Sequence, residues 1–109
     1  MIKAVVALPV LILAVGALMM AAPQDPDAKK VYLDKCSVCH GEDGKGQTAK
    51  GKKLKVKDVA SAEIRKMTDA DFLNAILKGK GQDMDGFEKE LGADMCRKIS
   101  VYMRGLAKP

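Results

Sequence analysis

The stretch Cys36-Ser37-Val38-Cys39-His40 decides how this chain is interpreted. Two thiols three positions apart, just after a helix, can reach the two vinyl groups on neighbouring edges of a haem. His40 follows directly, so its imidazole can lie under the ring and bind the iron. The stretch therefore predicts one covalently bound haem c, with both cysteines forming thioethers.

Other chemistries fit these three side chains less well. A thiol–disulfide redox pair is expected within a βαβ pattern, and the sequence has no convincing strand. A structural zinc site needs a second pair of ligands at suitable spacing, which is absent. A thiol–disulfide protein without haem stays as an alternative, which the colour of the purified protein would decide.

Residues 1–22 differ from the rest of the chain. They are apolar except for Lys3, Pro9 and Gly16. A basic start followed by an apolar run that ends in small residues is typical of a signal peptide, here cut after Ala21. The run also approaches the length of a membrane span, so an uncleaved anchor is the alternative. Either segment would export residues 23–109, the predicted haem domain, to the periplasm or otherwise out of the cytoplasm.

The exported part is poor in large apolar residues. Leu, Ile, Val and Phe make up less than a fifth of residues 23–109, and Trp is absent. A chain this short is too small for several domains. A domain this small and polar usually needs an additional stabilising element, such as a disulfide or a bound metal. A haem is a large apolar body that can supply the missing core. We expect several of these residues to line the porphyrin: Leu54, Val56, Val59, Phe72, Ile76, Phe87 and Leu91.

Local signals predict an all-α domain. Asp25 can cap a first helix that starts at Pro26 and runs to about Cys36. Thr68 can cap another helix, which Gly79 ends. The other segments are predicted, in chain order, as a loop over 41–57, a short helix over 58–66, a loop over 79–86 and a last helix over 93–106.

Residues 23–109 resemble the small class I monohaem c-type cytochromes along nearly their full length. This resemblance implies a cytochrome c-like fold of three to five helices around the haem. It also implies that the first and last helices cross at Tyr102, with Ala28 and Val31 as its neighbours. The residues that carry it are Val31-Tyr32, Cys36 to Gly41, Gly44-Lys45-Gly46, Ile76 to Gly81, Met84 with Phe87, and Tyr102.

The resemblance implies that the second axial ligand is Met84. A thioether sulfur is a soft ligand that suits haem iron, and His/Met coordination raises the reduction potential. Met84 is the lone apolar side chain in its loop, whereas Met67, Met95 and Met103 have packing roles on helices as their default. The alternative for Met84 is an exposed loop residue.

Two departures from the family pattern affect this site. Asp85 follows Met84 where the family commonly has Pro. The family also often has a Pro whose carbonyl orients the proximal His, but no Pro lies between Pro26 and Pro109. Another carbonyl would have to accept the ring N–H of His40.

These features predict an exported electron carrier and not an enzyme. His40 is the single His, and nothing else supplies a nucleophile or an acid–base pair. Ligands on both sides of the iron would leave no open position for oxygen or peroxide. The alternatives are a membrane-tethered haem subunit of a larger respiratory complex, and a ligand-binding or peroxidatic haem protein if Met84 does not coordinate.

The partners are predicted from charge. The Lys45–Lys57 segment holds six lysines and no acid, which fits a docking surface for an acidic redox protein or simply a solvated loop. Nucleic acid is not expected, because the domain is exported and lacks aromatic stacking platforms. The remaining Cys96 has the helical spacing of a small buried apolar residue; its alternative is an intermolecular disulfide, although a monomer is expected.

Overall fold

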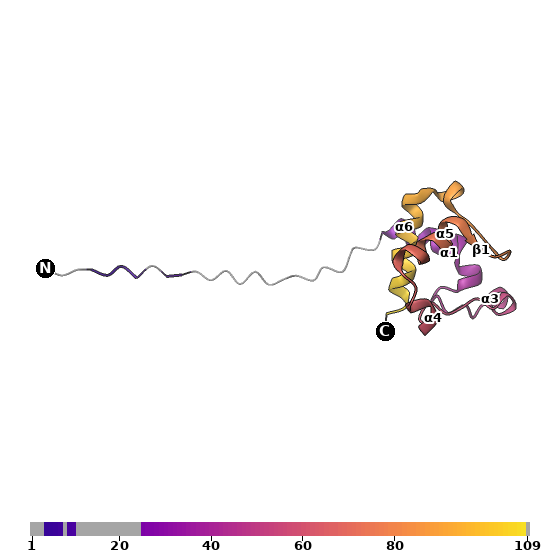
Figure 1. Ribbon diagram of the computed structural model, residues 1–109, viewed down its shortest axis with the longest axis horizontal. Coiled ribbons are helices and arrows are strands. Elements are labelled where there is room, and N and C mark those ends of the chain that lie inside the picture. Colours follow the sequence, from indigo (N-terminus) through magenta and orange to yellow (C-terminus); the bar gives the residue numbers. More distant parts are fainter. Residues whose placement is uncertain (1–3, 8, 11–24, 109) are drawn as a thin grey trace.

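The computed structural model describes residues 4–7, 9–10 and 25–108. The predicted signal peptide or anchor over 1–22 lies mostly outside them. Within the described ranges, no helix has the length and apolar character needed to cross a membrane. The elements are α1 (Pro26–Lys35), α2 (Ser37–His40), α3 (Ala49–Leu54), α4 (Ala62–Arg65), α5 (Asp69–Lys78), β1 (Gly79–Lys80), β2 (Met84–Asp85) and α6 (Glu88–Leu106), gathered into one globular part (Figure 1).

Two helices begin where capping chemistry predicts. The Asp25 carboxylate accepts a hydrogen bond from the Asp27 N–H at 2.8 Å, and Pro26 opens α1. The Thr68 hydroxyl accepts from the Asp71 N–H at 3.1 Å, which satisfies a free donor at the start of α5. Gly79 ends α5 with a φ of 85°, a conformation that favours glycine.

The core filled by the protein itself lies where α1 crosses α6. The rings of Tyr32 and Tyr102 lie 5.1 Å apart between centroids and are tilted by 52°. Ala28, Cys96 and Ile99 are fully buried around them. The predicted crossing is present, but the aromatic neighbour of Tyr102 is Tyr32, while Val31 lies half-buried at its edge.

The loop predicted over 41–57 is wrong in part, because it contains the helix α3. Its N-cap is Thr48, and Lys55 ends it in the left-handed region with a φ of 57°. The helix is under two turns long and rich in Gly and Lys, so it shows no apolar period that a sequence pattern could detect. It packs against α2.

The loop predicted over 79–86 is also wrong in part, because β1 and β2 pair as an antiparallel hairpin, with Lys80 opposite Met84. Strands of two residues are too short to show alternation. The short helix predicted over 58–66 covers only Ala62–Arg65. The all-α cytochrome c-like class holds. The described chain nevertheless has six helices where three to five were predicted, since α2, α3 and α4 are all short.

The last helix begins earlier than predicted. It starts at Glu88, but Gly92 has a non-helical backbone with a φ of 80°, which separates a first turn from the long part. That long part matches the predicted 93–106 segment.

Candidate haem site

One apolar cavity collects the predicted site residues. Cys36, Cys39, His40 and Met84 all line a cavity of about 430 Å³. Of the seven apolar residues predicted to line the porphyrin, six are in its wall and Leu91 is not; Leu91 packs against the core in the turn before Gly92. The apolar wall consists of Val38, Leu54, Val56, Val59, Ile64, Met67, Phe72, Ala75, Ile76, Phe87 and Met103.

The Cys36–His40 segment is fixed to the helix crossing. The Cys36 N–H donates to the Tyr32 carbonyl at 2.9 Å, which joins the end of α1 to α2. The Tyr32 hydroxyl donates to the Gly41 carbonyl at 2.5 Å, in a buried position just past His40. Burial raises the pKa of Tyr32, so the phenol stays a proton donor. The sequence alone did not assign Tyr32 this role.

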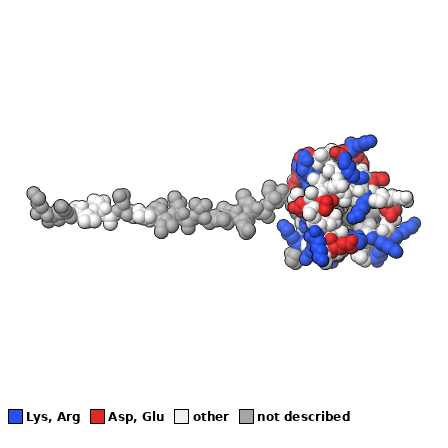
Figure 2. Space-filling model, in the orientation of Figure 1, with Lys and Arg blue, Asp and Glu red and all other residues white. Residues whose placement is uncertain are grey.

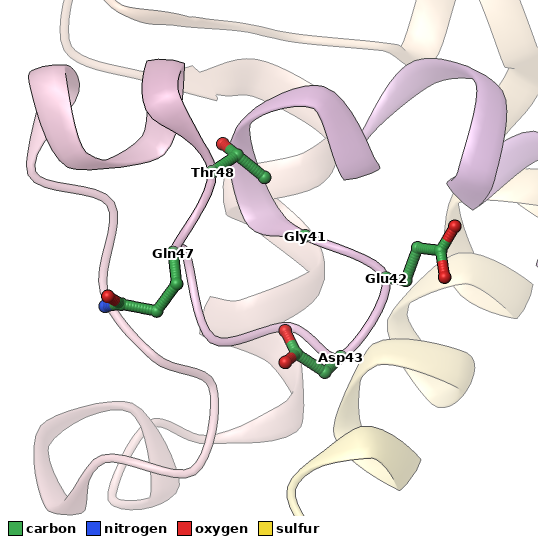
Figure 3. Close-up of a pocket in the computed structure, with 5 residues that line it drawn as sticks. All are labelled: Gly41, Glu42, Asp43, Gln47 and Thr48. Carbon is green, nitrogen blue, oxygen red and sulfur yellow. The ribbon is translucent and has the colours of Figure 1, made fainter.

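A second support comes from Thr48 and Gly51. The Thr48 hydroxyl donates to the Val38 carbonyl at 2.7 Å and lies 3.2 Å from the Cys39 carbonyl. Figure 3 shows Thr48 beside α2. A Cβ atom at Gly51 would lie 2.2 Å from the Cys39 carbonyl oxygen, so only glycine allows α3 to approach α2 this closely. These two residues were missed because their role depends on the α2–α3 contact.

The loop between α2 and α3 also borders a small polar hollow of about 330 Å³, lined by Gly41, Glu42, Asp43, Gln47 and Thr48 (Figure 3). Asp43 accepts a hydrogen bond from the Lys45 N–H at 3.0 Å, which is a turn within the loop. None of the four predicted site residues lines this hollow, whereas all four line the apolar cavity.

The imidazole of His40 is suited to bind a metal ion. Burial lowers its pKa, which favours the neutral ring that binds metals. Its Nδ1 atom is buried and has no hydrogen-bond partner among the described residues. The carbonyl predicted to accept from this ring is therefore not found there. A half-buried imidazole that favours its neutral form, at the wall of an apolar cavity, fits a haem iron.

The two motif cysteines fit covalent attachment. Both are free thiols and only half-buried at the cavity. Burial, and next the nearby thiols of Cys96 and Cys39, raise the pKa of Cys36 to about 11. Cys96 is fully buried in the helix crossing, as its helical spacing predicted, and burial raises its pKa as well.

An all-α fold around an apolar cavity that holds a Cys-x-x-Cys-His segment defines the class of the c-type cytochromes. The family model described as "Cytochrome C oxidase, cbb3-type, subunit III" matches residues 23–103, and the chain belongs to this family. The solved structure of the c-type cytochrome KustC0563 is similar, with 30% sequence identity and a TM-score of 0.67. That match covers 74% of this chain and 98% of the other. No curated protein sequence matches the chain.

The chain is thus a small monohaem c-type cytochrome with covalently bound haem c, a haem-based electron carrier. Proteins of this class are typically exported.

Proposed function

We propose that this cytochrome is an exported carrier of single electrons between protein redox partners, with His40 and Met84 as axial ligands. The observation that carries the proposal is that one apolar cavity contains both the Cys36–His40 segment and Met84, which come from distant parts of the chain. When bound, the haem supplies a reversible one-electron couple.

Each side chain has a distinct role in this proposal. Cys36 and Cys39 hold the haem through thioethers, and His40 binds the iron directly after them. Met84 would bind the iron as the second protein ligand, which would leave no site for an exogenous ligand. The apolar wall would limit the access of water to the iron, which would favour the less charged ferrous state.

The hairpin supports Met84 as a ligand. The antiparallel register sets Gly79 opposite Asp85 and Lys80 opposite Met84. The Phe87 N–H donates to the Ile76 carbonyl at 2.9 Å, which ties the end of the hairpin to α5. A paired strand loses less conformational entropy than a free loop when its side chain binds a metal. This pairing restrains the backbone at Met84, where the next residue is Asp85 and not Pro.

The spectrum of the oxidised holoprotein tests the ligand assignment. We expect the far-red sulfur-to-iron charge-transfer band, and we expect its loss in Met84→Ala. Met67→Ala and Met103→Ala are matched controls, because both side chains also line the cavity, and both variants should keep the band. A high-spin spectrum in the wild type would instead favour a ligand-binding or peroxidatic haem protein.

Charge at the cavity rim supports an acidic partner. The six lysines of Lys45–Lys57 are all exposed, and basic side chains project along the α3 side of the globular part (Figure 2). Three of these six also line the cavity, as do two further lysines from α1 and β1. We call these five the rim lysines: Lys35, Lys50, Lys55, Lys57 and Lys80.

A positive rim would steer an acidic protein to the edge of the cavity. We expect electron exchange with an acidic redox protein to slow as ionic strength rises, and to slow further in Lys50→Glu/Lys55→Glu. The control is Lys29→Glu/Lys30→Glu on α1, which makes the same charge change on exposed residues away from the cavity. Equal slowing in both double variants would reject a docking surface at the rim.

A membrane-tethered subunit of a larger respiratory complex is the second candidate, because the family takes its name from an oxidase subunit. The fate of residues 1–22 separates the two. Mass spectrometry of the exported protein gives a new N-terminus at Ala22 if the segment is a cleaved signal peptide. An intact N-terminus, with the protein extracted from membranes only by detergent, would support the tethered subunit.

A further inference from the structure

Arg104 ties the C-terminal part of α6 to the segment before α5. Its Nη2 donates to the Met67 carbonyl at 2.5 Å, and its Nη1 donates to the Ile64 carbonyl at 3.4 Å. Its Nε lies 3.2 Å from a carboxylate oxygen of Asp69, although this nitrogen has no aligned hydrogen-bond partner within the described residues. The side chain is 23% exposed, so this charge is largely removed from solvent.

The same guanidinium lies against the wall of the haem cavity. Its Cζ atom is 4.7 Å from the centroid of the Phe72 ring, within the range of a cation–π contact. Phe72, Ile64 and Met67 all line the cavity. Arg104 therefore contacts three wall residues from behind, and its positive charge is one aromatic ring away from the cavity.

A fixed charge in this position acts on redox equilibrium. Oxidation of a haem adds one positive charge, which a nearby cation disfavours. The effect is strong where the path between the charges is apolar and weak where solvent screens them. Asp69 is 95% exposed, so its counter-charge offsets the effect of Arg104 only in part.

We infer that Arg104 is a positioning residue that raises the reduction potential through its charge, which its hydrogen bonds to the Ile64 and Met67 carbonyls hold behind Phe72. This inference rests on the proposed function, because it requires the haem to occupy the cavity. It assigns a role in tuning the potential to a residue outside the Cys36–His40 segment and Met84.

The experiment compares midpoint potentials of purified holoproteins. Arg104→Gln should lower the potential, shifting the equilibrium constant for electron exchange with a mediator by about three-fold or more toward the oxidised cytochrome. Arg104→Lys should retain most of the wild-type value because it keeps the charge. Asp69→Asn should shift the potential the opposite way, by a smaller amount.

Arg65→Gln is the matched control. Arg65 is exposed on α4 and donates to the Ala107 carbonyl at 2.8 Å, so its loss also removes an arginine link to the end of α6 but no charge behind the wall. The midpoint potential of Arg65→Gln should equal that of the wild type. If Arg104→Gln keeps the wild-type potential, or if Arg104→Lys falls as far as Arg104→Gln, the inference is wrong. If Arg104→Gln yields no holoprotein, the potential of Asp69→Asn is the deciding measurement. A value that does not rise above that of the wild type overturns the inference.

The far-red band separates this result from a failure of the proposed function. If the wild type lacks the band, the assignment of His40 and Met84 as the iron ligands is wrong. A wild type with the band, and variants with unchanged potentials, would leave that assignment intact and reject the role of Arg104.

Discussion

The helix crossing and the haem cavity differ in how completely their side chains are buried. At the crossing, Ala28, Tyr32 and Ile99 are completely buried by other side chains of the same chain. Around the cavity the wall is mixed: Phe72 and Ile76 are buried in the core, whereas Met84 and Phe87 remain half-buried. The chain thus packs one part of its interior by itself, and the other part has the shape and chemistry for a cofactor. This explains how a sequence so poor in large apolar residues can still specify a compact domain.

The strongest test of this contrast is His40→Ala. We expect the loss of stable red holoprotein and of much of the helical signal, because residues that line the cavity, such as Met84 and Phe87, would lose their contacts with the haem. Absorbance and circular dichroism of the purified protein measure both. Met95→Ala, on α6 and away from the cavity, should keep the haem. A natively folded His40→Ala protein without haem would contradict the comparison.

Gly51→Ala should have the next largest effect. The added Cβ atom would meet the Cys39 carbonyl 2.2 Å away and force α3 from α2, at a cost of about 2 kcal/mol in the free energy of unfolding. Denaturant unfolding measures this cost. Lys50→Ala, an exposed change on the same helix, is the control and should stay close to the wild type.

Tyr32→Phe tests the link between the two regions. It keeps the ring at the crossing but removes the donor to the Gly41 carbonyl, so we expect a loss of about 1 kcal/mol in unfolding free energy. Tyr102→Phe shares the ring contact without the bond to Gly41 and should cost less. Equal losses in the two variants would show that the hydrogen bond to the motif contributes nothing.

Asp25→Asn should have the smallest effect, and one that depends on pH. A hydrogen bond from the Lys98 ammonium, and next the Asp27 N–H, lower the pKa of Asp25 below its ordinary 3.8. Its charge therefore stabilises the fold above that pH, and the contribution is lost as pH falls through the lowered value. Asn can still cap α1, so melting temperatures should differ slightly at neutral pH and converge in acid. A difference that persists once the Asp25 carboxyl is protonated would point to the cap and not to the charge.

What the sequence could predict depended on how local the signal was. The Cys36–His40 segment, and the caps at Asp25 and Thr68, are readable within a few residues, and the structure has both caps where they were predicted. Helix α3 and the hairpin were missed because each is too short to show a period and forms only against its neighbours. Arg104 carried no signal, since its partners lie 40 and 37 positions earlier in the chain.

The break at Gly92 divides α6 into two parts that contact different regions of the molecule. The first turn carries Glu88, which pairs with Lys78 beside the hairpin, while the long part after the break carries the crossing. In a continuous helix the direction of the Glu88–Leu91 turn would be fixed by the direction of the part that carries Ile99 and Tyr102. The break at Gly92 frees these two directions from each other, so the end of the Met84 hairpin and the helix crossing each meet α6 at an angle of their own.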